Sequence, residues 1–146
     1  MPPQALACRL SCLTDEADDL QNSEIGEEED KMKVSELIAC SGAKCLTGEF
    51  EDREIACGYT CDLLSHVMGK GQADMAWITV QAHMNVIAVA ALLDFACVII
   101  PENLPVEAPI IAKAQDEDIV LLSSEKTAYE LLVLLYENGV PSAKKG

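Results

Sequence analysis

The chain has 146 residues, half of them apolar, and a net charge of −15. This length suits one domain with a substantial hydrophobic core. The negative charge argues against nucleic acid or an anionic membrane surface as a partner, because both are polyanions. The longest apolar run, 86–93, is far shorter than the roughly 20 residues that span a bilayer. We therefore expect neither a nucleic-acid-binding nor a membrane protein.

Acidic residues are concentrated at the N-terminus. Residues 1–31 contain nine of the 25 acidic residues, two basic residues and few large apolar side chains. A segment of this composition cannot bury enough surface to fold. We expect residues 1–31 to be an acidic disordered tail or, because the pattern becomes regular from Met32, to precede the true start of the protein. Residues 32–146 are expected to form the folded domain.

The cysteines indicate a reducing environment. There are seven, an odd number, and Cys45, Cys57 and Cys97 lie in or beside apolar runs. The N-terminus lacks the basic flank and apolar run of a secretory signal. Free cysteines pack as small hydrophobic residues in cytosolic proteins. No pair has the spacing of a zinc or iron–sulfur site. We predict a cytoplasmic protein with no metal and no cofactor.

From residue 33 onward, short apolar strands alternate with helical patterns. The strands are expected at 44–46, 54–58, 76–80, 97–100 and 119–122, and the helices at 34–40, 62–68, 85–95, 109–116 and 126–138. Alternation of this kind predicts an α/β fold with three layers, in which crossover helices join a mainly parallel sheet of four to five strands. The helix at 85–95 is apolar nearly all round, which suggests a homodimer. The tail at 141–146 is expected to be frayed.

The turn at 79–85 is the first candidate site. Gln81 and His83 follow the predicted strand 76–80, and Asn85 could cap the next helix. Ligands of parallel sheets bind where strands end and helices begin, and free N–H groups at a helix start attract anions. The alternative is structural: Asn85 only caps, Gln81 bonds a neighbouring loop and His83 is solvated.

A second candidate turn spans 58–62. Gly58 would allow a tight turn or a close backbone approach, and Thr60 or Asp62 would cap the following helix. If both turns lie at one edge of the sheet, Tyr59, Asp62, Gln81 and His83 line one pocket. Ordinary capping is the alternative. After the last strand, Ser123–Thr127 is expected to supply an N-cap serine.

Three segments together resemble a known family, namely GYTCDLLSHVMG, AWITVQAHMN and IAVAALLDFACVII. With the ending LLSSEKTAYELLVLLYENGV, they make residues 32–146 similar to a stand-alone member of the DRTGG-domain family. The literal Asp-Arg-Thr-Gly-Gly string is absent, and its nearest pieces are Asp52-Arg53 and Cys57-Gly58-Tyr59. The resemblance implies an α/β fold similar to the N-terminal domain of HPr kinase/phosphorylase and a regulatory role. Stand-alone members are often encoded beside iron-only hydrogenase components.

The sequence contains no G-x-x-x-x-G-K-[ST] motif, so it is not itself an HPr kinase. We expect a non-catalytic cytoplasmic regulatory module, tied to hydrogenase or central carbon metabolism, that binds a small anionic metabolite or nucleotide, or a partner protein. The predicted ligand-binding residues are Gly58, Tyr59, Asp62, Gln81, His83 and Asn85. Two alternatives stay open. One is a protein-interaction scaffold, and the other is a small transferase or hydrolase that uses His83 as general base.

Overall fold

The structure is a computed structural model that describes residues 31–143. The predicted acidic tail therefore lies outside the described residues, except for Lys31. The end of the predicted frayed tail, 144–146, also lies outside them.

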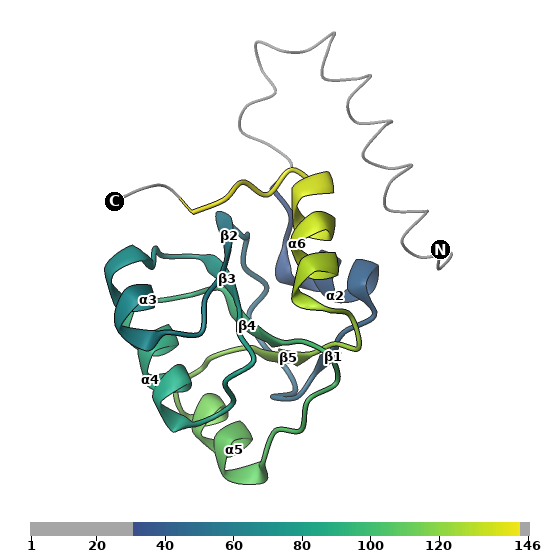
Figure 1. Cartoon of the computed structure of the whole chain (residues 1–146). Coiled ribbons are helices and arrows are strands. Elements are labelled where there is room, and N and C mark those ends of the chain that lie inside the picture. The colour runs from purple at the N-terminus through teal and green to yellow at the C-terminus, as the bar shows by residue number, and fades with distance from the viewer. Residues whose placement is uncertain (1–30, 144–146) are drawn as a thin grey trace, which may run out of the picture.

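A five-stranded sheet forms the centre of the domain (Figure 1). Its order is β1-β5-β4-β3-β2. The strands β2 to β5 are mutually parallel, and the short strand β1 pairs antiparallel with β5. The bounds are β1 Lys44–Cys45, β2 Cys57–Thr60, β3 Met75–Ile78, β4 Cys97–Ile100 and β5 Leu121–Ser123. The predicted α/β class and mainly parallel sheet are confirmed.

Helices cover both faces of the sheet, which gives the three predicted layers (Figure 1). Three crossover helices pack on one face, and two helices pack on the other. The crossover helices are α3 Leu64–Lys70, α4 Met84–Leu92 and α5 Ala108–Asp116, and the opposite pair is α2 Val34–Ser41 and α6 Ala128–Glu137. From β2 to β5 the sheet grows one strand at a time, so connections of one hand place all three crossovers on the same face.

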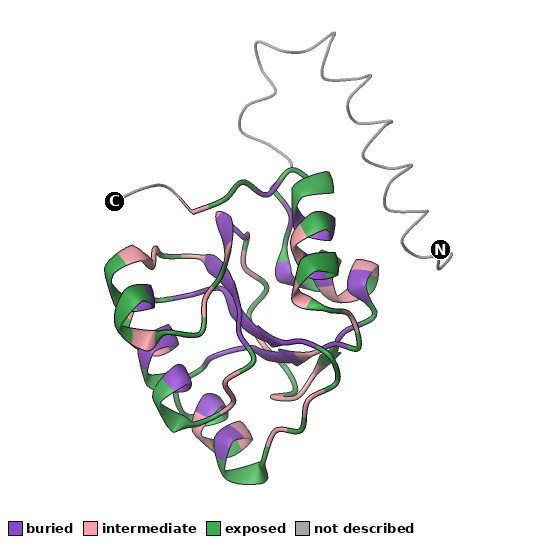
Figure 2. Cartoon of the chain, in the orientation of Figure 1, coloured by how far each residue is buried: buried purple, intermediate pink, exposed green. Residues whose placement is uncertain are grey.

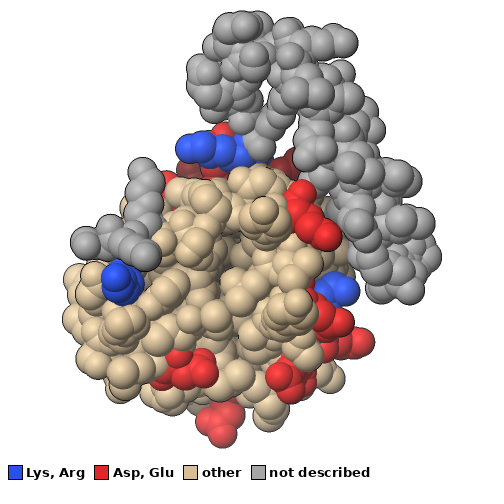
Figure 3. Space-filling view, turned by 45° about the horizontal axis from the view of Figure 1, so that its top comes forward, with Lys and Arg blue, Asp and Glu red and all other residues tan. Residues whose placement is uncertain are grey.

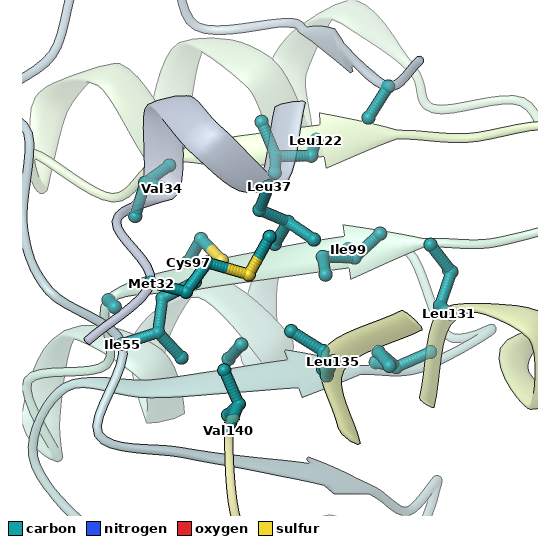
Figure 4. Packing of buried hydrophobic residues seen from close by; sticks show 14 of the residues in the cluster. Met32, Val34, Leu37, Ile55, Cys97, Ile99, Leu122, Leu131, Leu135 and Val140 are labelled. Atoms are coloured by element: carbon teal, nitrogen blue, oxygen red, sulfur yellow. The ribbon is translucent and has the colours of Figure 1, made fainter. Parts of the chain in front are cut away.

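The core lies on both sides of the two central strands. Every residue of β3 and β4 is buried, and the helices bury the side that faces the sheet (Figure 2). On the α2–α6 face, Leu131 and Leu135 pack toward Ile99 and Cys97 (Figure 4). On the other face, Trp77 meets Phe95 edge to face, with ring centroids 5.6 Å apart. Trp77 is fully buried in this part of the core.

The strand predicted at 54–58 is β2, which begins three residues later and ends two residues later. The segment before it pairs elsewhere: Ile55 N–H donates to the Met32 carbonyl, and Ala56 N–H donates to the Asp74 carbonyl. The sheet register therefore begins with Cys57 opposite Met75. Gly58 consequently lies inside a strand, and the predicted turn at Gly58-Tyr59 is wrong.

The prediction that residues 141–146 are frayed is wrong for residues 141–143, which the structure describes. Residues 141–143 run alongside β2, where Gly58 N–H donates to the Pro141 carbonyl at 2.8 Å and Ala143 N–H donates to the Gly58 carbonyl at 3.1 Å. Pairing with an open sheet edge satisfies backbone groups that fraying would leave to water. This contact covers part of the outer edge of the sheet.

Charged side chains lie on the surface, and acidic groups outnumber basic ones on the face drawn in Figure 3. Half-buried Arg53 is the main exception, and it bonds acidic partners. Within residues 31–143, no helix has the length and apolar character needed to cross a bilayer.

Candidate functional site

The carboxyl ends of the four parallel strands together form one edge of the sheet. This edge differs from the outer edge along β2. The turn from β2 to α3 covers 61–63, and the turn from β3 to α4 covers 79–83. Because β2 and β3 pair in register, with Thr60 opposite Ile78, these two turns are neighbours. Thr60 Oγ1 adds a bond of 2.9 Å to the Ile78 carbonyl. The predicted meeting of the two turns at one edge therefore occurs.

Asp62 joins the two turns. Its Oδ1 accepts a hydrogen bond from Thr79 Oγ1 at 2.8 Å and another from Val80 N–H at 3.0 Å. Thr79 is 1% exposed, and its hydroxyl also accepts the N–H of Gln81 at 3.2 Å. A carboxylate with two donors is held firmly, since charge-assisted bonds are the stronger kind. Asp62 thus fixes the β3–α4 turn and places its own charge next to Gln81.

The prediction that Thr60 or Asp62 caps α3 is wrong. The N-cap of α3 is Leu63, which makes no side-chain cap bond. Thr79 offers Asp62 a hydroxyl donor that sequence spacing cannot reveal. Thr79 begins the predicted candidate turn, but it was not among the predicted ligand-binding residues. The available signal was a hydroxyl residue directly after a fully apolar strand.

His83, and not Asn85, is the N-cap residue of α4. His83 has extended backbone angles and makes no side-chain cap bond, and the first turn of α4 contains no acidic residue. Asn85 is already the second residue of the helix, so the prediction that it caps α4 is wrong. Both side chains are exposed. The start of α4 therefore presents backbone N–H groups without a competing side-chain acceptor.

Tyr59 and Gly58 lie on β2, and successive strand residues point to opposite faces. Tyr59 is half-buried on the crossover side, and burial, followed by its contact with Cys61, raises the pKa of its hydroxyl. Gly58 is approached by α6: a Cβ there would lie 2.9 Å from Leu135 Cδ1. The predicted close backbone approach at Gly58 is confirmed, and α6 and residues 141–143 make it.

The other two turns at this edge differ in charge and capping. Glu102, Glu107 and Glu125 are exposed there. The N-cap of α6 is Thr127, which forms a reciprocal capping box with Glu130, so the predicted serine cap is wrong. Ser124 instead accepts the N–H of Lys126 at 3.1 Å. An anion at this edge would be attracted to the start of α4 and repelled by the acids of the neighbouring turns.

Among the described residues, no three histidine, cysteine or acidic side chains gather closely enough to hold a metal ion. Cys45, Cys57, Cys61 and Cys97 are free thiols. Cys61 is near the site through its backbone, since its carbonyl accepts the Trp77 indole N–H at 2.9 Å. The arrangement offers binding groups, namely a carboxylate, an amide, an imidazole and helix N–H groups.

The sequence matches no protein-family model and no curated protein significantly. A solved structure does share the fold. It is the crystal structure of the CBS and DRTGG domains of the regulatory region of Clostridium perfringens pyrophosphatase, complexed with its activator diadenosine tetraphosphate. The TM-score is 0.60 and the identity 11%, over 77% of this chain and 50% of that chain. This chain thus spans half of its neighbour's length. At that identity the likeness shows a DRTGG-like fold alone.

Proposed function

We propose that this protein is a non-catalytic cytoplasmic regulatory module of DRTGG type. In this proposal it binds a small anionic metabolite or nucleotide at the carboxyl ends of β2 and β3. One observation carries the proposal: Asp62 locks two adjacent turns together beside a helix start that has no side-chain cap. The nucleotide held by the structural neighbour makes a nucleotide a reasonable first ligand to test.

Each predicted residue has a place in this proposal. An anionic group would accept the N–H groups at the start of α4, and exposed His83 would supply a second donor. Gln81 and Asn85 flank that position on either side in the chain, while Tyr59 and Asp62 form the β2 side. Gly58 contributes indirectly, because the absence of a side chain there allows Leu135 of α6 to pack closely against β2. Occupancy of the turns would shift a conformational or assembly equilibrium.

A catalytic role for His83 has less support. A general base needs a partner that orients it and a nucleophile within hydrogen-bond reach. Among residues 31–143, the His83 side chain makes no hydrogen bond to a carboxylate, hydroxyl or thiol. A regulatory role therefore remains our first choice, and a tie to hydrogenase or central carbon metabolism stays a prediction.

The test is a thermal-shift screen of the full chain against adenine and guanine nucleotides, acetyl phosphate, coenzyme A and inorganic phosphate. A ligand at 100 times its dissociation constant stabilises the folded state by about 2.7 kcal/mol, which raises the melting temperature by several degrees. His83→Ala should abolish the shift. His66→Ala is the matched control, since His66 is the other histidine and is exposed on α3. A flat screen, or equal loss in both variants, would contradict the proposal.

A homodimer is favoured by the outer face of α4. Met84, Ala88 and Leu92 lie at positions i, i+4 and i+8 of a helix without charged residues, and Met84 and Leu92 are 44% and 69% exposed. An antiparallel α4 pair would place Met84 against Leu92 of a second copy around the small Ala88, which is a self-complementary arrangement. We propose this face as the dimer contact.

Light scattering over a protein concentration series tests the dimer. Leu92→Glu should make the protein monomeric. The control is Tyr129→Glu, because Tyr129 is 76% exposed on α6, on the other side of the sheet. A monomeric wild-type protein would remove the dimer from the proposal. If Tyr129→Glu dissociated the dimer and Leu92→Glu did not, the contact would belong to α6.

A partner protein remains the alternative to a small ligand, and α6 favours it. Tyr129, Val133 and Tyr136 form an exposed stripe along that helix. Tyrosine is enriched in protein interfaces because its ring buries a large area while its hydroxyl can stay hydrogen-bonded.

A further inference from the structure

The outer side of α6 carries an apolar surface that no described residue covers. Tyr129, Val133 and Tyr136 lie at positions i, i+4 and i+7, and they are 76%, 36% and 79% exposed. They form one stripe, which we call the α6 stripe, opposite to the core residues Leu131 and Leu135. Exposed apolar patches on folded domains mark contacts with another surface. We therefore expect a further segment or molecule to cover the α6 stripe.

A disulfide adds an independent feature to the same layer. Cys40 lies in α2, which packs beside α6 on one face of the sheet (Figure 1). Cys40 is disulfide-bonded, whereas the four other described cysteines are free thiols. The partner of Cys40 therefore lies outside residues 31–143, where the sequence contains two cysteines, Cys8 and Cys12. The disulfide thus connects the α2–α6 layer to the N-terminal part of the chain.

The segment around those two cysteines has a composition that suits the α6 stripe. Residues 5–13 read ALACRLSCL, with seven apolar residues, one basic residue and no acidic residue. α6 contains Glu130 and Glu137 and no basic residue. Apolar character and charge are therefore complementary between the two segments. The nine acidic residues of the N-terminal part all follow, within 15–30, and α6 would repel them.

The length of the chain permits this contact. Met32 is buried in the core on the α2–α6 face, so the N-terminal part joins the fold on that side. Residues 14–31 can reach about 60 Å when extended, whereas α6 is only about 15 Å long. A tethered segment also has an effective concentration in the millimolar range, so even a small apolar contact can be occupied.

We propose that residues 5–13 cover the α6 stripe and that a disulfide between Cys40 and Cys8 or Cys12 holds them there. A dithiol reductant splits this bond: the dithiol becomes a disulfide, and its two hydrogens leave thiols on Cys40 and its former partner. Reduction thereby exposes an interaction surface on α6. Disulfides of cytosolic proteins are usually transient and redox-sensing in this way. The proposal depends neither on the anion site nor on the α4 contact, which use other surfaces.

The first test maps the disulfide in the full chain. The protein is equilibrated with oxidised glutathione, one molecule of which becomes two of glutathione for each disulfide formed. Free thiols are then alkylated, and the peptides are identified by mass spectrometry without reduction. The expected crosslink joins Cys40 to Cys8 or Cys12. A free thiol at Cys40, or a bond from Cys40 to any other cysteine, would overturn the proposal.

The second test measures whether the α6 stripe is covered. Hydroxyl-radical footprinting compares the oxidised full chain with the reduced and alkylated full chain. Tyr129 and Tyr136 should react several-fold more slowly in the oxidised protein. Tyr59 on β2 should react equally in both, which makes it the internal control. Equal rates at Tyr129 and Tyr136 in the two states would show that reduction uncovers nothing.

Two double variants of the full chain identify the covering residues. Leu6→Ser/Leu10→Ser removes apolar side chains from the covering segment, and the stripe should then react as fast as in the reduced protein. Leu20→Ser/Ile25→Ser removes as many apolar side chains from the acidic part and should keep the protection. Protection that survives in Leu6→Ser/Leu10→Ser and rises with protein concentration would assign the stripe to a second copy of the chain and overturn the proposal.

A pair of cysteine variants tests the role of the disulfide itself. Cys40→Ser should lose most of the protection under oxidising conditions. Cys45→Ser alters a free thiol on β1 and should keep it. Equal protection in the two variants would show that the disulfide does not hold the segment in place.

Discussion

At the scale of single residues, Arg53 shows how one side chain fixes the start of two strands. Its guanidinium bonds Asp74, just before β3, and Asp94 with the Phe95 carbonyl, just before β4. Desolvation of the half-buried group lowers its pKa, and the bonds to Asp74 and Asp94 outweigh that effect, so the pKa is raised overall. The planar fork of arginine is suited to several acceptors at once.

We predict that Arg53→Lys lowers the free energy of unfolding by about 2–3 kcal/mol, because lysine cannot reproduce the fork and leaves carbonyls unbonded. Urea unfolding measures the change. Lys113→Ala is the control: it breaks an exposed pair on α5 and should cost less than about 0.5 kcal/mol. Similar losses in the two variants would show that the Arg53 contacts are no more than surface pairs.

Asp52, next to Arg53, acts at the other end of the same segment. Its carboxylate accepts the N–H of Ser35 at 3.0 Å and the Ser35 hydroxyl at 2.6 Å, at the start of α2. The two residues that most resemble the named motif of the DRTGG family therefore both stabilise the fold here. Neither faces the candidate anion site.

At the scale of elements, the end of α3 depends on two glycines with opposite surroundings. Gly69 lies in the helix, and a Cβ there would meet nothing within 4 Å. Gly71 is the C-cap, and a Cβ there would lie 2.6 Å from Leu93 Cδ1 and 2.7 Å from the Phe95 ring. Helix geometry therefore tolerates a side chain at Gly69, and packing forbids one at Gly71.

We predict opposite effects for the same substitution. Gly69→Ala should stabilise the protein by about 0.5–1 kcal/mol, because alanine is the better helix former. Gly71→Ala should destabilise it by about 1–3 kcal/mol, because Phe95 and Leu93 must shift in a packed core. Thermal unfolding of both variants checks the pair. A stabilising Gly71→Ala would show that the ring moves freely.

Sequence patterns predicted most elements but not their ends. The buried strand β4 occupies the predicted residues, because Pro101 ends the apolar run 95–100 and therefore fixes the carboxyl end of the strand. The start of β2 shifted because Met32 pairs with Ile55, a contact across 23 positions. At the candidate site, the two polar turns were predicted, but their caps were not. Asp62 bonds Thr79 rather than its own helix, and local spacing carries no sign of that partner.

A repeated junction also escaped the pattern analysis. Asp74, Asp94 and Asp118 each precede a parallel strand, with φ of 63°, 61° and 58°. Aspartate is one of the few residues other than glycine that adopt this left-handed conformation readily. Each one reverses the chain before the next strand, at the edge formed by the amino ends of the parallel strands. The signal was present as an aspartate before each apolar run.

At the scale of the whole molecule, the two edges of the sheet have different electrostatic character. The carboxyl edge presents the uncapped start of α4, and the amino edge presents the ends of α4 and α5 together with free carboxylates. One helix, α4, thus places its positive end at the candidate site and its negative end at the opposite edge of the sheet. A parallel sheet with same-face crossovers produces this polarity directly.

The stability of the whole fold is expected to depend on pH in the alkaline range, and the Cys97 thiol is the group on which this prediction rests. Complete burial, followed by the influence of Cys45, raises the pKa of the Cys97 thiol from its ordinary 9.0 to about 12. Burial raises the pKa of Cys57 in the same direction. Below pH 9 the folded and unfolded chains both keep the Cys97 proton, so the protonated thiol makes its full contribution to the free energy of unfolding. Between pH 9 and 12 the unfolded chain loses the proton first, and stability falls.

We predict that the free energy of unfolding declines by about 1.4 kcal/mol per pH unit above pH 9 on account of Cys97. Urea unfolding under reducing conditions at pH 7.5, 9, 10 and 11 measures the slope. Cys97→Ala should be less stable at pH 7.5, because it leaves a small cavity beside Leu37 and Ile99, yet its alkaline slope should be shallower. Subtracting the two curves removes the contributions of lysines and tyrosines, which both proteins share. Parallel curves would mean that the Cys97 thiol ionises as readily in the folded protein as in the unfolded chain, and that the core around β4 admits water.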